Sequence, residues 1–185
     1  MIKYSLLFLV VLMTLIGCFP VREIPLTDYT NEKLDLPFKV DSFDIVDARK
    51  EIQPMNWDVP LMSTKTREWR GNPKFSDINQ TDITQIIRQS EKPNGIPVNL
   101  EIRILEGECQ LNADWKSMTE YAKFRAEITV EIPSRNYTFR SSAEMYYQIP
   151  TLNGTEKGCL RLYNQAVKNV THTALKLIKE EIIID

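Results

Sequence analysis

The sequence contains a single histidine, His172, and only three cysteines among its 185 residues. It has no Cys-x-x-Cys pair and no His-Glu-x-x-His motif, so the spacings typical of zinc sites are absent. Gly154 and Gly158 are not followed by the Lys-Ser/Thr pair of a phosphate-binding loop. Glu106 and Glu108 fit a solvated turn better than a pair of catalytic acids. We therefore expect no catalytic residues, no metal and no cofactor, and a protein that is not an enzyme.

An excess of basic residues is also missing. The chain has 23 lysines and arginines against 25 aspartates and glutamates, which gives a formal net charge of −2. A protein that binds nucleic acid needs a concentrated basic face, so we expect no nucleic-acid partner. Hydrophobic residues make up 43% of the chain, which is enough for the core of one domain at this length.

The longest apolar run lies at the N-terminus, from Leu6 to Ile16, behind a single charge at Lys3. As a helix this run would cover roughly 17 Å, well short of the ~30 Å hydrocarbon core of a bilayer. A cleaved leader over residues 1–17 therefore fits better than a retained membrane span.

The leader ends in Leu15-Ile16-Gly17-Cys18, which resembles the lipobox of bacterial lipoproteins, although Ala or Ser is more usual in place of Ile16. The resemblance implies cleavage before Cys18 and attachment of palmitate and other acyl chains to this cysteine, which anchor a protein stably. The alternative is an ordinary secretory leader followed by a chance cysteine. Phe19 stands where Asp would favour the inner membrane, so we expect a lipid anchor on the periplasmic face of the outer membrane. Surface exposure and a Gram-positive anchor are the alternatives.

Residues 18–37 contain three prolines and little periodicity, which predicts a lipidated N-terminus followed by an extended tether. Residues 38–185 are then expected to form a single α+β periplasmic domain.

The two cysteines of this domain, Cys109 and Cys159, are an even pair in an oxidising compartment. They predict a disulfide that closes a loop of about 50 residues, which the chain-entropy model values at roughly 4 kcal/mol. The alternative is a pair of buried thiols.

Alternating apolar and polar residues predict strands at 98–104, 122–132 and 137–149, the last two joined by a hairpin connection at 133–136. A fourth strand is expected over 38–49, bulged between Val40 and Phe43. A short helix is expected after Thr81, which is a good N-cap residue. A C-terminal helix over about 159–180 has the following apolar stripe: Tyr163, Ala166, Val167, Val170, Ala174, Leu177 and Ile178. His172 lies away from this stripe, so we expect it to be exposed.

The polar positions of the strands are charged, so one face of the sheet is expected in solvent with cross-strand ion pairs. These positions include Arg103, Lys123, Arg125, Glu127, Arg140 and Glu144. Only the apolar face of an antiparallel sheet then needs a cover. The sequence predicts an α+β two-layer sandwich, in which a mainly antiparallel sheet of about four strands has two helices on one face, in the order β-α-β-β-β-α.

This layout behind a lipobox resembles small outer-membrane lipoproteins of Gram-negative bacteria. Two such families are the lipopolysaccharide-transport lipoprotein that plugs its partner barrel and the auxiliary lipoproteins of ABC-type lipid transporters. The strand that ends in Asp47-Ala48-Arg49 also looks like the start of YajG-type envelope lipoproteins. The resemblance implies a non-enzymatic accessory role and transfers one functional residue, Cys18. From the residues alone, Asp47 and Arg49 are expected to form an ion pair at the strand end.

Trp57 and Trp69 lie in the irregular segment 55–75 and are candidates for contact with a partner protein. The alternative is that this segment folds back over the sheet edge and buries them. The long hairpin 121–149 is expected to project beyond the helices and to offer a tip or edge for docking or strand addition. We therefore expect a lipid-anchored accessory or assembly subunit that works through an envelope protein partner. The alternative is a lipoprotein that binds a lipid or another small apolar ligand.

Overall fold

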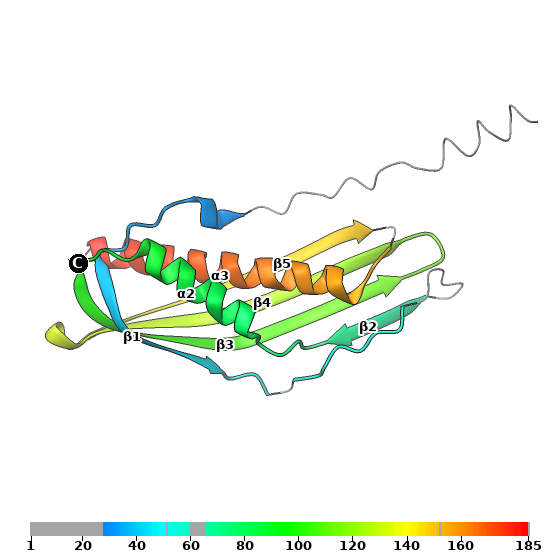
Figure 1. Cartoon of the computed structure of the whole chain (residues 1–185), viewed down its shortest axis with the longest axis horizontal. Coiled ribbons are helices and arrows are strands. Elements are labelled where there is room, and N and C mark those ends of the chain that lie inside the picture. The colour runs from blue at the N-terminus through cyan, green and yellow to red at the C-terminus, as the bar shows by residue number, and fades with distance from the viewer. Residues whose placement is uncertain (1–27, 51, 60–65, 152, 185) are drawn as a thin grey trace, which may run out of the picture.

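The computed structural model describes residues 28–50, 52–59, 66–151 and 153–184. Its elements in chain order are η1 (Tyr29–Asn31), β1 (Phe38–Asp47), β2 (Arg67–Gly71), α2 (Asp77–Ser90), β3 (Ile96–Ala113), β4 (Met118–Ile132), η2 (Pro133–Arg135), β5 (Tyr137–Thr151) and α3 (Glu156–Ile184). Figure 1 shows both helices on one face of an extended sheet, which confirms the predicted α+β sandwich.

The sheet is mixed and has five strands, in the order β1-β3-β4-β5, with β2 beside β3. The structure thus has one strand more than the expected sheet of about four, because the segment that forms β2 was predicted to be irregular. β3 is long enough to pair with β1 over its first half, in parallel, and with β2 over its second half, antiparallel. The connections β3–β4 and β4–β5 are antiparallel hairpins, as predicted.

The three predicted alternating strands form the centre and one edge of the sheet. Along β4 every second side chain is buried, and the intervening ones are half-buried or exposed. The buried set packs into one core with α3, and Phe124 meets Tyr163 edge-on with ring centroids 5.6 Å apart. The outer face has the expected cross-strand ion pairs: Lys123–Glu106 at 2.6 Å, Arg125–Glu106 at 3.0 Å, Lys123–Glu144 at 3.4 Å and Arg140–Glu127 at 3.7 Å. Glu106 therefore belongs to the strand and not to a turn.

β1 has the predicted bulge, since its register against β3 shifts between Val40 and Ser42. In Figure 1 the β3–β4 connection extends past the start of α3. Trp115 in this connection is 72% exposed. At the opposite end, the connection between β4 and β5, which contains η2, lies beyond the end of α3 in Figure 1, as expected for this hairpin, so the sheet projects beyond the helix at both ends.

α3 covers β4 and β5 and is longer than predicted. Six of the seven predicted stripe residues are buried, but Leu177 is 39% exposed. The expectation for His172 was wrong, because its side chain is 3% exposed. Its Nε2 lies 2.8 Å from the backbone oxygen of Glu32, a contact between segments that are far apart in the chain.

α2 begins earlier than predicted, and its N-cap is Ser76 rather than Thr81. The backbone N–H of Asn79 donates to the Ser76 hydroxyl, and the backbone N–H of Ser76 donates to the Asn79 side chain. This reciprocal arrangement satisfies two donors at the helix start. The Thr81 hydroxyl instead donates to the backbone oxygen of Asp77, 2.8 Å away.

The segment 28–37, expected to belong to the tether, packs on the domain. Leu34 and Leu36 are buried in the core, at 1% and 0% exposure. The backbone N–H of Leu36 donates to the Ser90 oxygen at 2.7 Å. The folded domain therefore begins before residue 38, and residues 18–27 of the expected tether lie outside the described residues.

Candidate functional site

The predicted lipidation site, Cys18, and the leader before it lie outside the described residues. Among the helices that the structure describes, none is both long and apolar enough to span a bilayer. Within the same residues, no group of three or more His, Cys, Asp or Glu side chains is arranged to hold a metal ion.

The two tryptophans of the segment 55–75 are half-buried and pack against the core. Trp69 lies in β2 opposite Leu111 of β3. The backbone N–H of Trp57 donates to Glu156 at the start of α3, 3.1 Å away. The described part of this segment therefore folds back along the sheet edge, and a partner contact through either tryptophan stays a prediction.

Cys109 and Cys159 are buried and free in the structure, which is the alternative to the predicted disulfide. Each thiol meets a backbone carbonyl: Cys109 Sγ lies 3.5 Å from the oxygen of Cys159, and Cys159 Sγ lies 3.4 Å from the oxygen of Gln110. Burial raises the pKa of the Cys159 thiol to about 12 and also raises the pKa of Cys109. Burial thus disfavours the thiolate, which is the reactive form of a cysteine.

The predicted Asp47–Arg49 ion pair is present where β1 leaves β3. Arg49 Nη2 lies 2.6 Å from Asp47 Oδ2, and the Arg49 side chain is only 4% exposed. Arg49 Nη1 also donates to the backbone oxygen of Pro73 at 2.9 Å. A Cβ at Gly107 would lie 2.7 Å from this nitrogen and 2.9 Å from the Tyr163 hydroxyl. This cluster joins β1, β3 and α3 and has a structural role.

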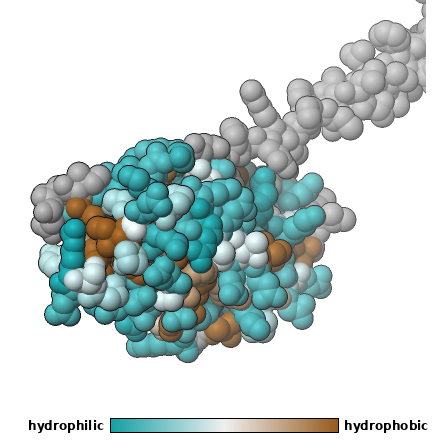
Figure 2. All heavy atoms as spheres, turned by 60° about the vertical axis from the view of Figure 1, so that its left-hand side comes forward, coloured by the Kyte–Doolittle hydropathy of each residue, from teal (hydrophilic) through white to brown (hydrophobic). Residues whose placement is uncertain are grey.

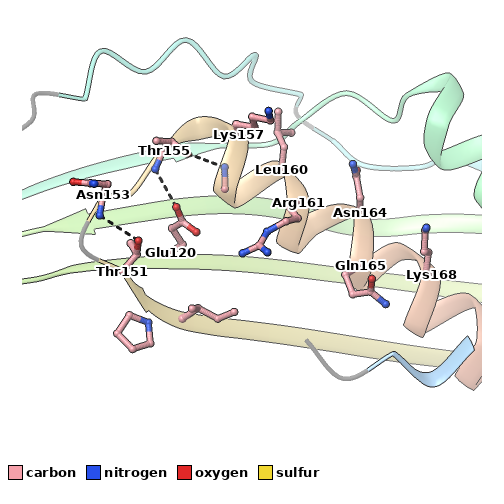
Figure 3. A pocket seen from close by; sticks show the side chains of 13 residues that line it. Glu120, Thr151, Asn153, Thr155, Lys157, Leu160, Arg161, Asn164, Gln165 and Lys168 are labelled. Atoms are coloured by element: carbon pink, nitrogen blue, oxygen red, sulfur yellow. Dashed lines mark hydrogen bonds between the residues drawn. The ribbon is translucent and has the colours of Figure 1, made fainter. Parts of the chain in front are cut away.

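A groove of about 730 Å³ lies between α3 and the end of β5 (Figure 3). One wall is the first half of α3, with Lys157, Leu160, Arg161 and Lys168, and the other wall includes Ile149 of β5. The groove is open and carries both apolar and basic side chains. Such a surface suits an elongated partner segment better than an enclosed small molecule.

Glu120 of β4 forms the floor of this groove and is 5% exposed. Its carboxylate accepts a hydrogen bond from the backbone N–H of Thr155 at 3.0 Å, and the Thr155 hydroxyl accepts one from Gly158 N–H at 2.9 Å (Figure 3). Burial raises the pKa of Glu120, whereas the hydrogen bond from Thr155 and the charge of Arg161 act to lower it. A Cβ at Gly158 would meet the carboxylate at 2.1 Å. Glu120 therefore holds Thr155, whose hydroxyl in turn caps the first turn of α3.

The edge of the sheet beside this groove is β5. In the described part of the chain β5 pairs with β4 and with no other strand. Every second residue from Arg140 to Pro150 is exposed, whereas the residues that face α3 are buried or half-buried. An edge strand presents unpaired backbone donors and acceptors to a possible partner strand. The sequence predicted the strand and its alternation but not its place at the edge, because local alternation does not encode neighbours.

The surface in Figure 2 is largely hydrophilic and is interrupted by separate hydrophobic patches. Exposed or half-buried apolar side chains also line a shallow surface pocket beside β1 and the start of α2: Phe43, Ile45, Ile52 and Phe75.

Comparison with known proteins gives no matching family model and no similar curated protein. A solved structure from Xanthomonas campestris, assigned to the family DUF330, has a TM-score of 0.41 and 10% sequence identity over 80% of this chain and 86% of that chain. A similarity at this level carries no argument about the function of the present chain.

Proposed function

We propose that this chain is a lipid-anchored, non-enzymatic envelope lipoprotein that serves as an accessory or assembly subunit through protein contacts. The observation that carries the proposal is the groove along the first half of α3, with Lys157, Arg161 and Lys168, beside β5, which pairs with β4 alone among the described strands. Strand edges and adjoining grooves are recurring sites of peptide recognition in proteins. The resemblance of Leu15-Ile16-Gly17-Cys18 to a lipobox supports the anchor, and Phe19 after the cysteine supports the outer-membrane location.

The state of the polar groups supports a binding role over a catalytic one. Glu120, the buried acid of the groove, already accepts the Thr155 N–H. The two buried thiols have raised pKa values, and Arg49 is held by Asp47. Each of these groups has a partner or an environment that serves the fold.

The packing between sheet and helix also favours protein contact over the alternative of a bound apolar ligand. Phe124, Ile128 and Tyr163 are each at most 1% exposed and fill the space between β4 and α3. A lipid would need this volume, and protein interiors at ordinary packing density leave no room for one.

Two measurements on intact cells test the proposal. Radiolabelled palmitate should label the wild-type chain and leave Cys18→Ser unlabelled, and only the wild type should fractionate with the membrane. A photo-reactive residue in place of Lys157, in the groove, should give a discrete cross-link to one other envelope protein. The same residue in place of Glu101, on the outer face of β3, is the control. An unlabelled wild-type chain, or equal adducts from both positions, would contradict the proposal.

A further inference from the structure

α3 carries a row of cations along most of its length. Lys157, Arg161 and Lys168 line the groove beside the first half of the helix, and Lys176 and Lys179 follow toward its end. Positions 157, 161, 168 and 179 fall within about 40° of one another around a helix that turns by about 100° per residue. These five residues are called the basic row below, and its two halves have different surroundings.

The C-terminal half of the basic row is covered by the chain's own segment before β1, which lies beside this half of α3 in Figure 1. Lys176 Nζ donates to the Glu32 carboxylate at 2.9 Å. Lys179 Nζ donates to the backbone oxygen of Leu34, and His172 Nε2 lies 2.8 Å from the backbone oxygen of Glu32. α3 therefore already binds a segment outside the helices and strands, through one carboxylate and two backbone carbonyls.

The segment that covers this half is acidic, with three acids and one lysine over residues 28–36. Asp28 at its start reaches the groove. The hydrogen bond from the Thr30 hydroxyl lowers the pKa of Asp28 most, and the Gln165 side chain and the charge of Lys168 lower it further. Gln165 and Lys168 both line the groove. The acidic contact thus extends along α3 as far as the end of the groove.

The N-terminal half of the basic row has the same chemistry and lines the groove. Its lining residues include three cations, Lys157, Arg161 and Lys168, and one carboxylate, Glu120. Glu120 is 5% exposed and accepts a backbone N–H, so its charge is directed into the fold. Lys168 lies 3.3 Å from Asp82 and keeps 35% of its side chain exposed, and Lys157 and Arg161 are exposed. The groove therefore presents positive charge to a partner.

We propose that the groove binds an acidic, non-helical segment of the envelope protein partner, as residues 28–36 bind the other half of the basic row. The inference names the chemistry of that partner and rests on the proposed function. Complementary charges give such a contact its specificity and speed its formation. Leu160, Ile149 and Pro150 also line the groove and would contact apolar side chains between the acids.

The spacing of the cations suits an extended segment. Lys157 and Arg161 are separated by a rise of about 6 Å along the helix, and Arg161 and Lys168 by about 10 Å. An extended chain advances about 3.3 Å per residue. Acids two or three residues apart in the partner segment would therefore face successive cations of the groove.

A charge reversal in the groove tests the inference in cells. The photo-reactive residue stays at position 157, where the proposed function already predicts a cross-link. Arg161→Glu should lower the yield of this cross-link roughly fivefold, because repulsion replaces attraction at an exposed contact. Arg161→Lys should retain most of the yield. Arg103→Glu, at a 46% exposed side chain on the outer face of the sheet, makes the same change in net charge and should leave the yield unchanged.

A peptide titration tests the charge preference directly and includes a second variant. The full chain in non-ionic detergent is titrated against a short dye-labelled peptide of alternating Glu and Ser, and fluorescence anisotropy measures binding. A peptide of alternating Lys and Ser is the control and should not bind. Lys157→Glu and Arg161→Glu should each weaken binding of the Glu peptide roughly fivefold, and Arg103→Glu should leave it unchanged. Lys157 is exposed, so its replacement separates loss of binding from loss of folding.

The outcomes distinguish this inference from the proposed function. A cross-link at position 157 that Arg161→Glu leaves undiminished would overturn the inference and leave the proposed function standing, whereas no cross-link at all would contradict both. An adduct with phospholipid alone, or with the chain's own residues 19–27, would show another occupant and overturn the inference. Equal binding of the Glu and Lys peptides would also overturn it.

Discussion

The carboxylate of Glu91 accepts a hydrogen bond from the backbone N–H of Val40 across 2.9 Å. Glu91 also holds Arg88, with 3.1 Å between Arg88 Nη1 and Glu91 Oε1, and Arg88 donates in turn to the Val40 oxygen. The side chains of Arg88, in the last turn of α2, and of Glu91, its C-cap residue, thus bind the backbone N–H and C=O of Val40 at the β1 edge. Among the described strands, β2 and β5 also pair with one neighbour each.

Loss of the contacts of Glu91 should be measurable in stability. Glu91→Ala removes the acceptor of Val40 N–H and the ion pair with Arg88, and we expect the free energy of unfolding to fall by about 1–2 kcal/mol. Glu101→Ala is the matched control, because its pair with Arg103 is 3.7 Å long and both side chains are about half exposed. Denaturant titration of both variants checks the prediction, and an equal effect at the two positions would contradict it.

The ion pair between Asp47 and Arg49 should make the free energy of unfolding depend on pH. Asp47→Asn leaves the buried guanidinium without its carboxylate and should cost roughly 2–3 kcal/mol, less than for a fully buried pair because Asp47 is partly exposed. Asp41→Asn, in an exposed pair with Lys39, should change stability by less than about 0.5 kcal/mol.

The sign of the pH effect follows from the direction of the shift. The hydrogen bond from Arg49 lowers the pKa of Asp47 in the folded state. Above the unfolded pKa of about 3.9 the stabilisation is complete, and it is lost as the pH falls through the folded pKa. The stability difference between wild type and Asp47→Asn should therefore shrink in acid. A difference that grew on acidification would contradict this account.

The strands and the C-terminal helix were predictable because their patterns are local. Alternation over Ala122 to Ile132 needs only the period of a strand, and the stripe from Tyr163 to Ile178 needs only the period of a helix. β2 was missed because its five residues, Arg67–Gly71, take their strand conformation from pairing with β3. His172 was misplaced because the segment that covers it, at Glu32, was assigned to a tether.

The two cysteines should behave as protected thiols. In the Cys18→Ser chain without reductant, a thiol reagent should react slowly with the native protein and should titrate two thiols after denaturation. The reason is that burial raises the pKa values of both groups, that of Cys159 to about 12. A count of zero after denaturation would show that the cysteines are bridged, as the compartment alone predicted.

The tryptophans offer a matched comparison of packing. Trp69→Ala should lower the free energy of unfolding by about 2–3 kcal/mol, somewhat less than a full core truncation. Trp115→Ala, at a side chain 72% exposed, should change it by less than about 0.5 kcal/mol. Thermal and denaturant unfolding measure both, and a neutral Trp69→Ala that abolished binding to a partner would restore this tryptophan as a contact residue.

The candidate site was only partly predictable from sequence. The charges at Arg140 and Glu144 were assigned to a solvated face, but the place of their strand, β5, at the end of the sheet depends on the strand order. The groove depends on how α3 crosses β5, which brings Glu120 next to Thr155. No periodicity in the sequence encodes either relationship, because both join residues from different elements.

The lipid anchor at Cys18 is tested most directly by the mass of the N-terminal peptide. Membrane-extracted protein cut with trypsin should give a first peptide from Cys18 to Arg22 whose mass exceeds that of the unmodified peptide by a diacylglyceryl group and an amide-linked acyl chain. An unmodified peptide that begins at Cys18, or any peptide that contains residues before it, would contradict the account.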